Sequence, residues 1–192
     1  NINNIGNNYL KSNFKSYWKS RFYKKISPYD AWYSDDILYK IIKYRIGLNN
    51  SGEVFDFSIN QILRGLSANR YTVSFFKPIV AAIIYKKFLN GMENPVVIDP
   101  CAGFGARMLA FKSLYPNGYY IGIEPNPETF IELELLSKNF NGGIELHNCK
   151  LENYTGNKIA NLTFTSVPYY NNEIYSNGYN MNLDEWKYMM YI

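Results

Sequence analysis

The sequence predicts an α/β fold in which a mostly parallel, doubly wound sheet is preceded by a smaller helical part. Two observations predict it. From residue 96 onward, short apolar runs of strand length alternate with segments of helical spacing, which is typical of β-α-β units. Before that point the apolar residues recur mainly at helical spacing. We therefore expect a helical N-terminal subdomain in residues 1–66 and a second domain in residues 67–192, in a chain long enough for a real core.

The N-terminal part begins with an Asn-rich stretch, residues 1–8, which we expect to be disordered. In residues 9–25 apolar side chains recur at every fourth position from Leu10 to Phe22, and lysines share another face, so one long helix is predicted there. Ser27 and Pro28 end it. Two further helices and a turn are expected at residues 35–46, 59–66 and 49–52, respectively.

The second part opens with an extended segment, residues 70–76, that leads into a helix with Pro78 in its first turn. Strands are expected at residues 96–99, 119–124, 144–147 and 161–166. Helices are expected at residues 79–89, 106–114, 128–139 and 183–191.

The bulk composition narrows the possible functions. Lys plus Arg is 20 against 16 for Asp plus Glu, a net charge of +4, which is a mild basic bias compatible with nucleic acid. Two cysteines and one histidine offer neither a disulfide framework nor a metal cluster, and they argue against a Ser/His/Asp triad. No signal peptide is visible and the longest apolar run is too short for a bilayer, so a cytoplasmic location is expected.

The loop after the first predicted strand favours a nucleotide-like cofactor. The strand ends on Asp99, and Gly103 and Gly105 lack Cβ atoms that would keep a ligand away from the backbone. The next helix begins with free N–H groups, which favour a carboxylate. Glu124 ends the second strand, where it can accept hydrogen bonds from ribose hydroxyls. A nicotinamide cofactor is disfavoured because Met108 stands where the phosphate fingerprint needs its last glycine.

A second motif follows the fourth predicted strand, at residues Ser166, Val167, Pro168 and Tyr169. The Ser166 hydroxyl and the Val167 carbonyl can accept hydrogen bonds from an aromatic amine, while Pro168 stiffens the turn. Tyr169 can stack on the base that carries this amine. The four residues are called the base corner below.

In this order, the two motifs resemble the class I S-adenosylmethionine (SAM)-dependent methyltransferases of the amino-DNA-methylase group, over roughly residues 70–180. The resemblance implies a Rossmann-like domain, SAM as the cofactor, no metal, and the base corner as the catalytic element. The cofactor-binding residues that it implies are Phe76, Pro78, Asp99, Pro100, Cys101, Ala102, Gly103, Gly105, Glu124, Pro125 and Leu151. The chain departs from the pattern at Val167, where the family has proline, and around His147, where the family has an acid.

The activity expected from the resemblance is methyl transfer to the exocyclic amine of a flipped-out DNA base, with cytosine slightly favoured over adenine because the corner begins with serine. The alternatives are an RNA guanine-amine or protein glutamine methyltransferase, and a degenerate SAM-binding or nucleic-acid-binding module without activity. The resemblance also implies a bacterial or virus-encoded protein, with restriction-modification as one setting. The missing initiator Met and the end at Ile192 inside a predicted helix suggest a fragment, for which we expect weak SAM binding or none, and slow turnover or none.

Overall fold

The computed structural model describes residues 4–47, 58–74, 76–170, 173–174 and 182–189. Contacts group the chain into two compact units. We call them the sheet unit (residues 1–16, 74–170 and 181–192) and the helical unit (residues 17–73 and 171–180). The expected boundary after residue 66 stays a prediction; the two units differ from it in that residues 67–73 group with the helices and residues 4–16 with the sheet.

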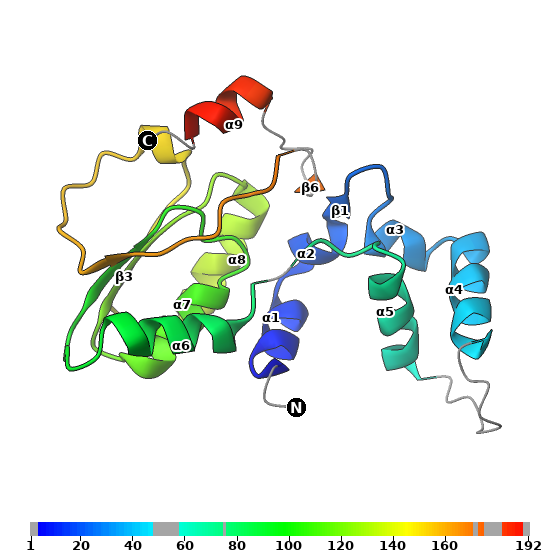
Figure 1. The fold of residues 1–192 in the computed structure, drawn as a ribbon, viewed down its shortest axis with the longest axis horizontal. Helices are drawn as coiled ribbons and strands as arrows, with labels where there is room; N and C mark the ends of the chain where they lie inside the picture. Colours follow the sequence, from blue (N-terminus) through cyan, green and yellow to red (C-terminus); the bar gives the residue numbers. More distant parts are fainter. Residues whose placement is uncertain (1–3, 48–57, 75, 171–172, 175–181, 190–192) are drawn as a thin grey trace. The chain divides into compact units, whose positions relative to one another are not determined.

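The sheet unit contains a four-stranded parallel sheet, which confirms the predicted α/β fold (Figure 1). Its strands stand in the order β4-β3-β2-β5. The strand of this sheet that comes first in the chain, β2, is therefore central, and the strand order reverses beside it, as in Rossmann-like sheets. Their bounds are Val96–Asp99 (β2), Tyr119–Ile123 (β3), Ile144–His147 (β4) and Leu162–Thr163 (β5).

Strand β5 is shorter than the predicted 161–166. Its ladder to β2 pairs Leu162 with Val97 and Thr163 with Ile98, and one further bond of 2.9 Å joins the Phe164 N–H to the Ile98 carbonyl. The chain then leaves the sheet, and the side chain of Thr165, instead of its backbone, makes the next contacts with the β2 end.

Helices α6 (Pro78–Phe88) and α7 (Ala106–Leu114) lie side by side on one face of the sheet. The Tyr85 ring of α6 lies 5.4 Å from the rings of both Phe111 and Phe164, and Phe111 packs on Tyr120 of β3. A third helix, α8 (Pro127–Ser137), joins β3 to β4, and a one-turn 3-10 helix, η2 (Leu151–Asn153), follows β4. The bounds of α7, β2 and β4 agree with the prediction.

The prediction of one helix over residues 9–25 is wrong. The structure has α1 (Asn7–Asn13), α2 (Lys15–Lys19) and a short strand β1 (Arg21–Phe22) in its place. Between the two helices Phe14 is extended and fully buried, with its ring 6.0 Å from that of Phe104. The helix breaks here because Glu132 of α8 accepts hydrogen bonds from the Lys15 and Ser16 N–H groups. Since α1 begins at Asn7, the expectation of disorder up to residue 8 is also wrong at its end.

The helical unit has the helices predicted for it, α4 (Asp35–Gly47) and α5 (Ile59–Ala68), and a short additional one, α3 (Pro28–Trp32). Ala31, Ile41 and Leu66 form its buried core. Strand β1 pairs antiparallel with β6 (Glu173–Ile174). The expected turn at 49–52 lies outside the described residues.

Helix α9 (Leu183–Met189) belongs to the sheet unit and corresponds to the predicted helix at 183–191. No helix within the described ranges is long and apolar enough to cross a membrane.

Candidate functional site

The loop between β2 and α7 is a tight turn that two glycines make possible. Gly103 and Gly105 have φ values of 53° and 71°, in the left-handed region that favours glycine. A Cβ atom on Gly105 would lie 2.7 Å from the side chain of Leu136, so an alanine there would have to displace this buried leucine. A Cβ on Gly103 would meet only the Cys101 carbonyl, at 3.9 Å. The side of Gly103 on which a Cβ would stand is therefore open.

Asp99, the last residue of β2, stabilises this loop through its buried carboxylate. Its side chain is fully buried, and its carboxylate accepts hydrogen bonds from Arg107 Nε (2.7 Å), the Tyr120 hydroxyl (2.6 Å) and the Thr165 hydroxyl (2.8 Å). Burial, reinforced by the nearby Asp99 charge, raises the pKa of Tyr120 well above its ordinary value, so that phenol stays protonated and donates. Asp99 was expected among the cofactor-binding residues, but its carboxylate is already engaged inside the protein.

Arg107 connects the loop to the segment upstream of α6. Its guanidinium is buried, pairs with Asp99, and also donates to the Cys101 carbonyl. The same group lies 4.9 Å from the centre of the Phe76 ring, which in turn packs edge-on against Phe164. Phe76 thus lies against Arg107, the side chain that donates to the Cys101 carbonyl of the loop, and its expected role in cofactor binding stays a prediction.

Glu124, at the end of β3, is buried against the glycine loop. One carboxylate oxygen accepts from the Gly103 N–H and the other from the Asn126 N–H, both at 2.9 Å. Burial raises the pKa of Glu124 to about 7, although the two N–H donors act in the opposite direction. Asn148, in the segment after β4, donates to the Glu124 carbonyl at 2.8 Å. The acid predicted from the sequence and the predicted glycine loop are therefore in direct contact.

The base corner begins immediately after Thr165. Ser166 is exposed, and Tyr169 exposes 61% of its surface. The Pro168 carbonyl accepts a hydrogen bond of 2.8 Å from the indole N–H of Trp186, on α9, whose ring lies 5.9 Å from that of Tyr170. The corner is thus held from α9, while the Tyr169 ring remains open to a partner.

Other predicted site residues have more ordinary surroundings. Pro100 and Ala102 are buried in the loop, and the Ala102 N–H donates to the Ile123 carbonyl at 2.9 Å. Pro125 and Leu151 are partly buried, directly after Glu124 and at the start of η2.

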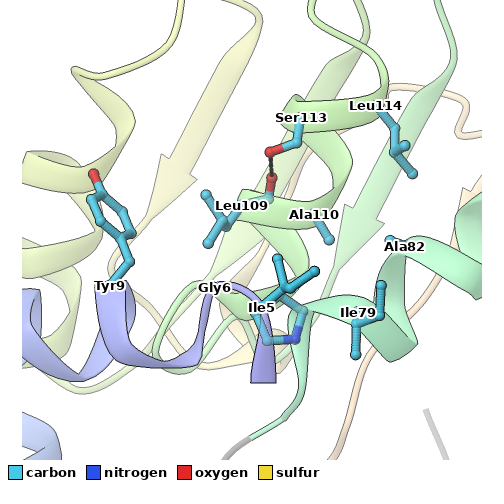
Figure 2. A pocket seen from close by; sticks show the side chains of 10 residues that line it. Ile5, Gly6, Tyr9, Ile79, Ala82, Leu109, Ala110, Ser113 and Leu114 are labelled. Atoms are coloured by element: carbon cyan, nitrogen blue, oxygen red, sulfur yellow. Dashed lines mark hydrogen bonds between the residues drawn. The ribbon is translucent and has the colours of Figure 1, made fainter. Parts of the chain in front are cut away.

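Cys101 and Pro78, two further predicted cofactor-binding residues, lie in apolar or buried environments. Burial raises the pKa of Cys101 to about 12, so its thiol is not a nucleophile at neutral pH. Pro78 lines a separate apolar pocket of about 350 Å³ between α1, α6 and α7, close to Gly6 and Leu109 (Figure 2).

Among the residues that bond to Asp99, to Cys101 or to the base corner, Tyr120, Thr165 and Trp186 were not found from the sequence. Only Thr165 could have been suspected from the sequence, because it is the polar residue that directly precedes the base corner. In the described part of the chain, no three His, Cys, Asp or Glu side chains are grouped so that they could hold a metal ion.

No family profile matches this sequence, and no curated protein matches it. Similar solved structures include a Listeria monocytogenes protein assigned to the class I S-adenosylmethionine-dependent methyltransferases (13% identity over 62% of this chain and 42% of that chain, TM-score 0.45). They also include a coclaurine N-methyltransferase bound to N-methylheliamine and SAH (13% identity over 68% of this chain and 48% of that chain, TM-score 0.41). A third is P. horikoshii TYW2 in complex with MeSAdo (22% identity over 46% of this chain and 33% of that chain, TM-score 0.38). The chain spans less than half the length of each, and likenesses this weak do not bear on activity or substrate.

Proposed function

We propose that the protein transfers a methyl group from SAM to the exocyclic amine of a flipped-out DNA base, with cytosine ahead of adenine. The observation that carries this proposal is the reversal of strand order beside β2. Ligands of open α/β sheets bind in the crevice at such a switch point, outside the carboxyl ends of the strands. The glycine loop follows β2 and the base corner follows β5, its neighbour, so the two motifs flank that crevice.

The cofactor half of the proposed site consists of Gly103, Gly105 and Glu124. The open side of Gly103 and the start of α7 suit a carboxylate, which the methionine part of SAM carries. Glu124 supplies a carboxylate for the ribose hydroxyls, and its contact with Gly103 keeps it beside the loop. SAM itself supplies an electrophilic methyl group on a sulfonium.

The base half consists of the base corner. An aromatic amine is a weak nucleophile because its lone pair is delocalised into the ring. Acceptors on the amine hydrogens, the Ser166 hydroxyl and the Val167 carbonyl, orient that lone pair toward the methyl group. With SAM bound, the C–S bond would break as the N–C bond forms, leaving the neutral thioether, and the methylated amine would lose one proton to water. Unstacking a base costs a few kcal/mol, and stacking on the exposed Tyr169 ring returns about 1–3 kcal/mol.

The test is transfer of labelled methyl from SAM to unmethylated DNA by the full-length protein, followed by digestion to nucleosides. We expect label in the cytosine amine, because the corner begins with Ser166. Label in the adenine amine instead would keep the proposed reaction and change the target base. Label in RNA or protein but not in DNA would replace the substrate and keep the methyl transfer. Absence of both SAM binding and transfer would overturn the proposal.

A further inference from the structure

The Thr165 hydroxyl joins the end of β5 to the glycine loop through two hydrogen bonds. It donates to Asp99 Oδ1 at 2.8 Å and accepts from the Cys101 N–H at 3.0 Å. Asp99 ends β2 and Cys101 lies in the loop that follows, so one side chain contacts two points of the proposed cofactor half. The hydroxyl acts as donor and acceptor at the same time, which serine can reproduce and valine cannot.

This contact lies where the backbone ladder has ended. After the Phe164 bond to Ile98, the hydroxyl of Thr165 is the next tie between the β5 strand end and β2. Ser166 is the following residue, and its Cα atom lies about 3.8 Å from that of Thr165. The position of the corner relative to the loop therefore depends on this side chain before the corner and on Trp186 after it.

The buried end of the contact is rigid. Asp99 also accepts from Arg107 and Tyr120, two buried side chains, so its carboxylate is held from several directions. The Thr165 hydroxyl, which is bonded to this carboxylate, is therefore held in place as well. Methyl transfer demands this, because reacting atoms must stand about 3–3.5 Å apart and a 1 Å misplacement costs about 10²-fold in rate.

We propose that Thr165 is a positioning residue that sets the distance between the base corner and the Cys101–Gly105 loop. The inference rests on the proposed function in so far as the distance matters for methyl transfer. The mechanical link between the two segments does not depend on that function, and it can be measured separately.

The experiment compares Thr165→Val, Thr165→Ser and Thr163→Val in the full-length protein. Thr163 is a matched control, since it is an exposed threonine two residues earlier in β5. Two quantities test the inference in each variant: hydrogen exchange of peptides covering residues 100–105 and 166–170, and the rate of single-turnover methyl transfer to DNA at saturating SAM. Calorimetry gives the SAM affinity as a third, control measurement.

We expect Thr165→Val to speed exchange in both segments and to slow transfer about 10- to 100-fold, with the Kd for SAM changed by less than about threefold. Thr165→Ser should restore both quantities, and Thr163→Val should change neither. Unchanged exchange in Thr165→Val overturns the inference, whether or not the protein methylates DNA. Faster exchange with an unchanged transfer rate also overturns it. If the wild-type protein transfers no methyl to DNA, the proposed function fails and the exchange data alone decide whether Thr165 links the two segments.

Discussion

The backbone N–H of Gly103 donates a hydrogen bond of 2.9 Å to the carboxylate of Glu124, 21 residues further along the chain. The contact joins the loop after β2 to the end of the neighbouring strand β3. It explains why Glu124 can be buried, because a carboxylate that accepts two N–H bonds recovers part of its lost hydration. Burial raises the pKa of Glu124 to about 7 even though this contact acts in the opposite direction, so the site has a group that titrates near neutral pH.

The stability of the ligand-free protein should depend on the titration of Glu124. Its pKa in the folded state is about 7, against 4.5 ordinarily, so the folded protein keeps a proton that the unfolded chain releases. The resulting stabilisation is complete below about pH 4.5, and the free energy of unfolding should fall as pH rises through 7. Urea unfolding between pH 5 and 8 should show this fall, and Glu124→Gln should remove it. Glu134→Gln, on the exposed part of α8, is the control and should leave the fall in place.

SAM affinity should change with pH in the opposite direction. Ribose hydroxyls donate more strongly to a carboxylate than to a neutral acid, so calorimetric affinity should increase from pH 6 to pH 8 as Glu124 ionises. Glu124→Gln should bind SAM more weakly at pH 8 and with little dependence on pH. An affinity that is flat across this range in the wild type would contradict the ribose role.

The two loop glycines should differ in what they tolerate. Gly105→Ala places a methyl group 2.7 Å from Leu136 at a φ of 71°, and it should cost about 2–4 kcal/mol of unfolding free energy from strain and overpacking. Gly103→Ala meets no such clash and should cost only about 1–2 kcal/mol. It should nevertheless weaken SAM binding, because its methyl group occupies the open side of the loop. Gly91→Ala, also at positive φ in open space, controls for strain alone.

Removing the guanidinium from the buried ion pair should be costly. Arg107→Met leaves Asp99 with an uncompensated buried charge, and we expect a loss of about 3–5 kcal/mol in denaturant unfolding. Adding Asp99→Asn should cost less than the sum of the two single changes. The control is Lys150→Met, which breaks a half-exposed pair with Glu185 and should cost less than about 1 kcal/mol. Equal costs for the two Met variants would contradict a structural role for the Asp99 network.

The exposed ring of Tyr169 should matter for activity and not for folding. Tyr169→Ala should leave unfolding free energy within about 0.5 kcal/mol, because 61% of the side chain is exposed. Transfer to DNA should fall about 5- to 150-fold, the equivalent of losing one base stack. Tyr39→Ala, in α4 and 66% exposed, should leave transfer unchanged. Equal effects of the two variants would argue against a stacking role.

Local pattern was enough to predict much of the sheet unit. The bounds of β2, α7 and β4 follow from short apolar runs and from glycine or proline at their ends, which are signals carried by neighbouring residues. The left-handed glycines at 103 and 105 and the acid at Glu124 were predictable for the same reason. Helix α6 begins at Pro78, as its fixed φ suggests, although the environment of Pro78 is an apolar pocket and not the loop.

The features that the sequence did not reveal depend on partners distant in the chain. The break between α1 and α2 follows from the Glu132 carboxylate, more than 110 residues away, and the local apolar spacing contains no trace of it. The role of Asp99 as a buried acceptor depends on Tyr120 and Thr165, which only the strand order brings to it. The four sheet strands and the helices that connect them could be located from the sequence, because they obey short-range periodicity and turn chemistry. Which of those side chains are buried and bonded to the loop, as Asp99 is, and which stay exposed, as Tyr169 does, depends on segments that meet only after folding, because burial and hydrogen bonding are set by those contacts.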